Sequence, residues 1–168
     1  HPDAEYVVLA INEKYVIIGE KLADALCKLL DVEKNVIART SGKQILDAHT
    51  QVHHPFVTDL IVPVIGSATV GTDEGTAVVH CAPGCGPEDY EIGVRNKLEI
   101  FSPVSPDGSY TKGIEPRELE GMKVSDGQIW VIKELAARDA MLYKTSLRHS
   151  YPHCWRCRNG LIFRATKQ

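Results

Sequence analysis

The chain has 168 residues, of which 43% are hydrophobic and 24% are charged, and its formal net charge is −3. This composition excludes wholesale disorder and fits one globular domain with a core of its own. No apolar run approaches the roughly 20 residues that a membrane-spanning helix needs, so we expect no membrane segment. The five cysteines follow no disulfide-framework spacing, which favours a reducing, cytoplasmic location.

The charge is unevenly distributed along the chain. Residues 138–168 hold seven Lys or Arg and one acid, Asp139, whereas residues 1–137 hold 12 basic and 21 acidic residues. A basic C-terminal segment on an acidic body suits a polyanion such as RNA. A solvated face or a contact with a neighbouring domain explains the same charge equally well. The start, His1-Pro2-Asp3, has no signal-peptide pattern, so we expect a piece of a longer protein.

The first third of the chain predicts a β-hairpin and a helix. Residues 6–11 (YVVLAI) and 15–18 (YVII) are rich in β-formers and are separated by a short polar turn. Residues 21–30 carry leucines at helical spacing, which predicts an amphipathic helix, and residues 36–38 suit another strand. The Pro in His54-Pro55-Phe56 then interrupts the pattern.

Further strands are expected over residues 60–65 (LIVPVI) and 76–80 (TAVVH), with a turn at 73–75. Pro87 suits the first position of a following helix. Ser125 and Gln128 have the spacing of a capping box, which predicts a helix over residues 126–140. Residues 151–166 predict a final hairpin. The fold class is therefore α+β and β-rich, with a closed or partly closed β-barrel and peripheral helices.

The loop over residues 81–86 is the strongest candidate for chemistry. His80 precedes it and Asp89 follows it at the start of the expected helix, so an imidazole and a carboxylate can face one cleft beside free backbone N–H groups. The carboxylate can hold an ammonium group, and the imidazole can orient a water or form a pocket wall. The structural alternative is that Asp89 only stabilises the helix N-terminus and that His80 is a core histidine.

The cysteines offer two weaker hypotheses. Cys81 and Cys85 flank the same loop, but neighbours on a strand point to opposite faces, which argues against a Cys81–His80 catalytic pair. Cys154 and Cys157 resemble half of a zinc site, with His149 or His153 as further candidate ligands. No second C-x-x-C is present, and no phosphate-loop, dinucleotide or serine-hydrolase motif is found.

Two segments closely resemble the isoleucyl-tRNA synthetase family. Residues 75–90 (GTAVVHCAPGCGPEDY) are similar to that family's editing signature G-T-G-x-V-H-x-A-P-G-H-G-x-D-D-Y. Residues 149–157 (HSYPHCWRC) and 162–166 (IFRAT) resemble the stretch in which the inserted domain rejoins the catalytic body. The valyl enzymes usually carry Lys in place of His80, and the leucyl enzymes lack the second stretch.

The resemblance implies the connective polypeptide 1 editing domain over residues 1–148, with residues 149–168 leading back to the catalytic body. That domain hydrolyses valine wrongly esterified to isoleucine tRNA by water attack, without a metal at the hydrolytic site. The residue matching Asp89 anchors the substrate ammonium, the one matching His80 shapes the pocket, and Gly84 and Gly86 contribute to the binding loop. The implied partners are the aminoacylated 3′ end of tRNA(Ile) and the rest of the synthetase, whose catalytic domain uses ATP and Mg.

Three positions depart from the family pattern: Ala77, Cys85 and Glu88 replace a Gly, a His and an Asp. The family's threonine-rich segment normally precedes the His-Pro-Asp start, so we expect the isolated chain to hold part of an active site. Cys154 and Cys157 are expected to form a zinc half-site that a C-x-x-C elsewhere in the full-length protein completes. The alternatives are a non-catalytic tRNA-binding or structural module of the synthetase and a zinc-ribbon-like module.

Overall fold

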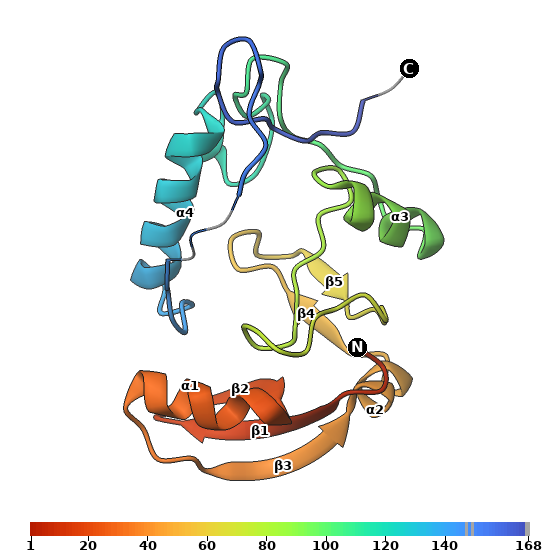
Figure 1. Ribbon diagram of the computed structural model, residues 1–168, viewed down its shortest axis with the longest axis vertical. Coiled ribbons are helices and arrows are strands. Elements are labelled where there is room, and N and C mark those ends of the chain that lie inside the picture. Colours follow the sequence, from red (N-terminus) through yellow and green to blue (C-terminus); the bar gives the residue numbers. More distant parts are fainter. Residues whose placement is uncertain (147, 149, 167–168) are drawn as a thin grey trace. The chain divides into compact units, whose positions relative to one another are not determined.

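The computed structural model describes residues 1–146, 148 and 150–166, which form two compact units. The first unit comprises His1–His53 and Leu60–His80, and the second begins with His54–Asp59 and continues from Cys81. Figure 1 shows the helices and strands of both units. The predicted boundary at residue 148 lies beside residue 149, which is outside the described residues, and stays a prediction.

The first unit is built on a three-stranded antiparallel sheet in the order β2-β1-β3. Strand β1 is Glu5–Ile11, β2 is Lys14–Gly19 and β3 is Val36–Ser41. The β1–β2 register runs from Tyr6 opposite Gly19 to Ile11 opposite Lys14, and the connecting turn places Asn12 at φ 52°. The predicted hairpin and the predicted strand after the first helix are therefore confirmed.

Helix α1 (Ala23–Leu30) covers one face of this sheet and follows a 3-10 turn, η1, over Glu20–Leu22. The helix ends at Leu30, and its C-cap residue, Asp31, adopts a left-handed conformation. Strand and helix side chains together form the core of the unit. Its buried members are Val7, Leu9, Ile11, Ile18, Ala23, Leu26 and Cys27.

The sequence predicts neither helix α2 (Gly42–Asp47) nor the short strand β4 (Gln51–His53). A capping box opens α2: Gln44 N–H donates to Ser41 Oγ (3.3 Å), and Ser41 N–H donates to Gln44 Oε1 (2.9 Å). Strand β4 pairs antiparallel with β5 (Ile61–Pro63), so the expected strand over residues 60–65 exists but is shorter than predicted.

The predicted strand over residues 76–80 is wrong, because this segment is irregular in the structure. Ala77 has a φ of +59°, which is incompatible with an extended strand. Two contacts to the sheet surround that backbone: Gly19 N–H donates to Thr76 O (2.9 Å) and Tyr6 Oη–H donates to Ala77 O (3.0 Å). Anchoring on the sheet therefore overrides the β-propensity of the segment.

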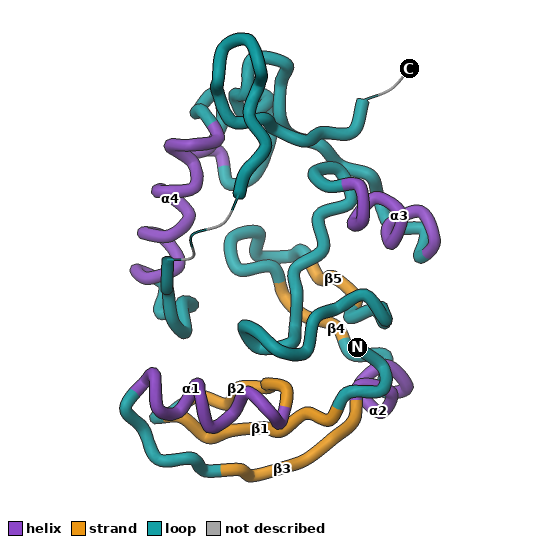
Figure 2. The backbone as a smooth tube through the Cα atoms, in the orientation of Figure 1, coloured by secondary structure: helices purple, strands orange, loops and turns teal. Residues whose placement is uncertain are grey.

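The second unit contains α3 (Pro87–Arg95), a 3-10 turn η2 (Arg117–Leu119) and α4 (Val124–Ala137). The rest of it consists largely of loops and turns (Figure 2). Helix α3 begins at Pro87 as predicted. In the final segment, His153 forms an isolated antiparallel bridge with Gly160, which agrees with the expected turn-back of the chain.

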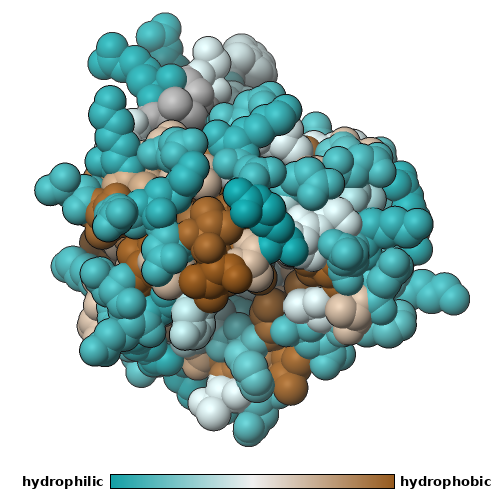
Figure 3. Space-filling view, turned by 90° about the horizontal axis from the view of Figure 1, so that it is seen from below, coloured by the Kyte–Doolittle hydropathy of each residue, from teal (hydrophilic) through white to brown (hydrophobic). Residues whose placement is uncertain are grey.

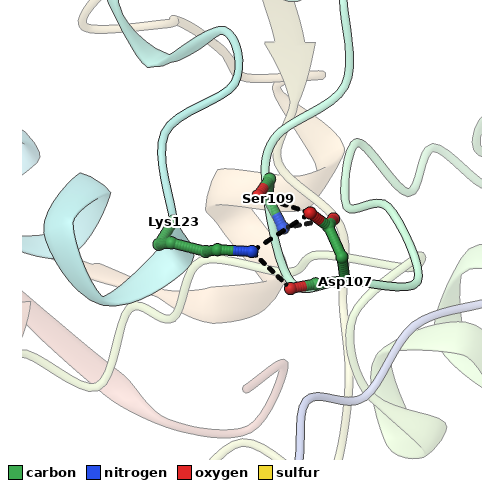
Figure 4. Close-up of polar contacts among 3 residues, drawn as sticks. All are labelled: Asp107, Ser109 and Lys123. Carbon is green, nitrogen blue, oxygen red and sulfur yellow. Dashed lines mark hydrogen bonds and ion pairs between the residues drawn. The ribbon is translucent and has the colours of Figure 1, made fainter.

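Helix α4 exists, but its predicted capping box does not. The N-cap is Lys123 and Ser125 lies inside the first turn, with no side-chain cap. The Lys123 ammonium group binds the 105–109 turn, at 2.7 Å from Asp107 O and 3.1 Å from Asp107 Oδ2 (Figure 4). Ser109 also bridges to Lys123. This anchoring explains why the helix begins at Val124, two residues before the predicted start.

The mixed α+β class is confirmed. Both sheets of the described residues are open, because their first and last strands do not pair with each other, and no closed barrel is found among the described residues. None of the helices in the described ranges combines the length and apolarity needed to cross a membrane. Apolar side chains also reach the exterior between polar ones, as the face drawn in Figure 3 shows.

Leu9 provides a direct test of the first unit's core. Its side chain is fully buried (0% exposed), whereas Leu29 on α1 is 51% exposed. We expect Leu9→Ala to lower the free energy of unfolding by about 2–5 kcal/mol, because it leaves a cavity, and Leu29→Ala to lower it by less than about 1 kcal/mol. Urea denaturation followed by circular dichroism measures both. Equal effects would contradict the assigned core.

Candidate functional site

Asp89 holds the loop that precedes α3. Ala82 N–H donates to Asp89 Oδ2 at 2.9 Å, while Cys85 N–H donates back to Ala82 O at 2.9 Å. Asp89 is the third residue of the helix, and its side chain is half-buried. The carboxylate therefore closes the loop over residues 82–89, and the helix N-terminus favours its negative charge. No donor to Oδ1 is found in the described part of the chain, which leaves that oxygen able to accept a ligand.

Gly84 is required by close packing rather than by its own conformation. A Cβ at this position would collide with the backbone carbonyl of Phe101. Gly84 O also accepts a hydrogen bond from Ala165 N–H at 2.8 Å, which joins the loop to the C-terminal segment. At Gly86 the backbone is extended (φ −153°), and an added Cβ would meet only Asp89 atoms at 3.9–4.0 Å. The structure thus requires glycine at 84 but not at 86.

His80 is exposed and ends the irregular segment of the first unit. The contacts of Thr76 and Ala77 with the sheet fix the backbone only a few residues before it. The division between the units falls at the His80–Cys81 peptide, so His80 and Asp89 belong to different units. Their predicted convergence on one cleft stays a prediction.

The thiols beside the loop are poor nucleophiles. Desolvation, together with the charge of Asp89, raises the pKa values of both Cys81 and Cys85. Both thiols are therefore protonated at neutral pH, and a catalytic cysteine must ionise to attack. The Cys81 thiol also lies 3.9 Å from Asp89 O. All five cysteines are free, as expected from their spacing.

Cys154 and Cys157 fit half of a metal site. Backbone N–H groups of Cys157 and Arg156, with the Cys157 thiol, donate to the Cys154 sulfur and lower its pKa, which favours the thiolate that zinc requires. Structural zinc takes four ligands, and no group of three potential ligands is found among the described residues. His149 lies outside them, and His153 Nδ1 is 2.7 Å from Tyr151 O. The half-site therefore stays a prediction.

Sequence reasoning missed two hollows found among the described residues of the second unit. One, of about 440 Å³, is lined by residues 56–59 and 115–118. Phe56 beside it packs on Trp130 (5.7 Å between ring centroids), and the Arg138 guanidinium lies 5.3 Å from the Phe56 ring. The other, of about 250 Å³, lies between the 105–108 turn and the Cys154–Cys157 hairpin. The one sequence feature near the first hollow is His54-Pro55-Phe56, where the proline interrupts the predicted pattern of strands and helices.

Comparison with known proteins defines the class. No family model matches the chain. Over its whole length, however, the chain is 35% identical to the isoleucine–tRNA ligase of Carboxydothermus hydrogenoformans, 37% identical to that of Sulfurihydrogenibium sp. and 38% identical to that of Thermotoga maritima. It spans about 18% of the length of these relatives.

The chain is thus homologous, end to end, to a segment of an aminoacyl-tRNA synthetase. The synthetase family concerned is isoleucine–tRNA ligase, as the resemblance of the loop and of the C-terminal stretch predicts.

The cysteines should differ in reactivity with pH. The pKa of Cys154 is lowered and those of Cys81 and Cys85 are raised, so Cys154 reaches half-ionisation at the lowest pH of the three. We expect iodoacetamide to alkylate Cys154 first as the pH rises from about 6 to about 9. Peptide mass mapping after timed labelling measures this order, with buried Cys27 as the protected control. Earlier labelling of Cys81 or Cys85 would contradict the assignment.

Proposed function

We propose that the chain is the connective polypeptide 1 editing domain of an isoleucine–tRNA ligase and that, as part of that enzyme, it hydrolyses Val-tRNA(Ile). The observation that carries the proposal is the loop tied by Asp89, which lies within the editing signature of a chain homologous to these ligases along its whole length. Residues 1–148 form the editing domain in this proposal, and residues 149–168 lead back to the catalytic body.

A separate editing site answers a physical limit on recognition. One methylene in an apolar pocket contributes only about 1–3 kcal/mol, a limit for which isoleucine–valine discrimination by these synthetases is the usual example. A second site that admits valine and sterically excludes isoleucine multiplies the discrimination. In the proposal, His80 forms part of the wall that excludes the larger side chain.

Asp89 has two oxygens with separate tasks in this proposal. Oδ2 accepts from Ala82 N–H and fixes the carboxylate on the loop. Oδ1 faces the ligand and binds the ammonium group of the aminoacyl ester, a charge-assisted contact that positions the ester carbonyl. A carboxylate that is already fixed loses little conformational entropy when it binds the ammonium group.

The reaction is hydrolysis by water. The water oxygen attacks the ester carbonyl carbon, the bond to the terminal ribose oxygen breaks, and that oxygen takes up a proton; free valine and tRNA(Ile) are the products. The raised pKa values of Cys81 and Cys85 favour water over a thiolate as the nucleophile.

No metal or other cofactor takes part at this site in the proposal, and ATP and Mg belong to the synthetic reaction of the parent enzyme. The proposal also includes a zinc site in which Cys154 and Cys157 are two of the ligands and the rest of the parent chain supplies the others. It further includes a closed or partly closed barrel in the complete domain.

The second candidate is a non-catalytic tRNA-binding or structural module. It is favoured by the seven Lys or Arg against one acid over residues 138–168. RNA affinity that falls with salt, without deacylation in the complete synthetase, would establish it.

Variants of Asp89 test the editing proposal. Asp89→Asn keeps an oxygen that can accept from Ala82 N–H but removes the charge, whereas Asp89→Ala removes both. We expect each variant, in the complete synthetase that carries this segment, to lower kcat/KM for Val-tRNA(Ile) hydrolysis by at least about thirtyfold, because the ammonium group loses its partner.

The matched control is Glu88→Ala, which removes a neighbouring exposed carboxylate from the same helix turn and should leave hydrolysis unchanged. Release of radiolabelled valine measures all three variants. If Asp89→Asn hydrolyses at the wild-type rate, the carboxylate only shapes the loop and its proposed binding role is wrong.

A further inference from the structure

The C-terminal hairpin presents its tip on a closed turn. Within residues 151–161, backbone hydrogen bonds join opposite sides of the turn, and the Tyr151 hydroxyl donates to Leu161 O at 2.7 Å. The backbone bonds run from Cys154 N to Asn159 O, from Arg158 N to Cys154 O and from Leu161 N to Pro152 O, at 2.8–3.0 Å. These contacts fix the backbone that carries residues 155 and 156.

A tryptophan and an arginine form a stacked pair at this tip. Trp155 is 83% exposed, the highest value among the exposed large hydrophobic residues of the described chain. The Arg156 guanidinium lies 4.9 Å from its ring centroid, within cation–π range. An exposed indole on a well-fixed turn is costly to leave in water, and such residues mark binding surfaces.

The surroundings of the pair are basic. Residues 140–168 contain no Asp or Glu, and Arg158 and Arg164 add positive charge to the hairpin. The acid that lines the adjacent hollow, Asp107, already binds Lys123 at 3.1 Å and Ser109 (Figure 4). The hydrogen bond from Lys123, followed by those from Ser109, holds the pKa of Asp107 below its usual range. The negative charge of Asp107 is therefore balanced by Lys123 within the same unit. The hairpin therefore attracts anions.

We propose that Trp155 and Arg156 form a stacking platform for unpaired nucleotides of an RNA strand. An aromatic ring stacks on any of the four bases, and a guanidinium stacks on a base or binds a phosphate group. The neighbouring Arg158 and Arg164 supply further positive charge for the phosphates of the RNA backbone. The inference rests on the proposed function only in taking tRNA as the natural source of that strand. It adds a contact surface distinct from the loop held by Asp89.

Charge favours RNA over a protein partner as the occupant. Trp155 alone would suit an apolar protein pocket, but burial there would desolvate the stacked Arg156 and require an acidic partner for it. An RNA strand supplies a π-face and a phosphate together. Docking on the rest of the synthetase is therefore the competing outcome of the test.

The experiment uses this 168-residue chain and a single-stranded RNA of about 12 nucleotides labelled with fluorescein. Anisotropy titrations should show binding that weakens about tenfold in Trp155→Ala and much less in Trp155→Phe, which keeps an aromatic face. Arg156→Ala should lower the slope of log affinity against log salt by about 0.7, the loss of one phosphate contact. The chain has two tryptophans, so Trp130→Phe isolates the Trp155 emission, which RNA should quench.

Matched controls come from exposed residues elsewhere. Tyr15→Ala removes an aromatic side chain that is 74% exposed on β2, and Arg95→Ala removes an exposed charge at the end of α3. Neither should change RNA affinity or the salt slope. Circular dichroism of each variant confirms that the fold persists.

Either of two results would overturn the platform: unchanged RNA affinity in both Trp155→Ala and Arg156→Ala, or a Trp155 that acrylamide cannot reach in the RNA-free complete synthetase. The second result would assign the surface to protein docking. Hydrolysis of Val-tRNA(Ile) is measured separately, with Asp89→Asn as reference. Wild-type RNA affinity in both Trp155→Ala and Arg156→Ala, with hydrolysis lost in Asp89→Asn, would refute the platform and leave the proposed function standing.

Discussion

The hydrogen bond from Ala82 N–H to the Asp89 carboxylate determines the form of the loop before α3, and the rest of the site depends on it. With the loop closed in this way, Gly84 lies against the Phe101 carbonyl and accepts a hydrogen bond from Ala165. Desolvation, followed by the charge of the same carboxylate, raises the pKa values of Cys81 and Cys85. One side chain thus shapes the loop, adds to the effect that keeps its thiols protonated and provides the charge that we assign to substrate binding.

Local sequence signals predict the elements whose stabilising contacts are local. The hairpin of β1 and β2, the amphipathic α1 and the proline start of α3 belong to this group. Ser41 and Gln44 carry an equally local capping signal for α2 that the sequence analysis did not use. The errors lie where distant contacts decide: Tyr6, 71 residues away in sequence, holds Ala77 in a conformation no strand allows, and Asp107 holds Lys123 at the start of α4.

The same distinction between local and distant contacts applies to the candidate site. Asp89 could be placed at a helix start from sequence because Pro87 and the acidic first turn are local features. The lack of room for a side chain at Gly84 depends on its approach to Phe101, 17 residues further along the chain. The bond from Ala82 to the carboxylate and the stacking of Arg156 on Trp155 are local contacts, but residue spacing alone does not specify their side-chain geometry. The position of His80 in a separate unit from Asp89 also required the structure. The chain is homologous to a segment of isoleucine–tRNA ligases, and the geometry of the loop indicates which carboxylate to test.

Editing is a claim about selectivity, so the most direct measurement compares the hydrolysis of Val-tRNA(Ile) and Ile-tRNA(Ile) side by side. The 168-residue chain and a version extended upstream through the threonine-rich segment typical of the family should both be assayed. The account predicts faster hydrolysis of the valyl ester than of the isoleucyl ester by the extended chain. Equal rates for both esters, or no hydrolysis of the valyl ester by either chain, would contradict it.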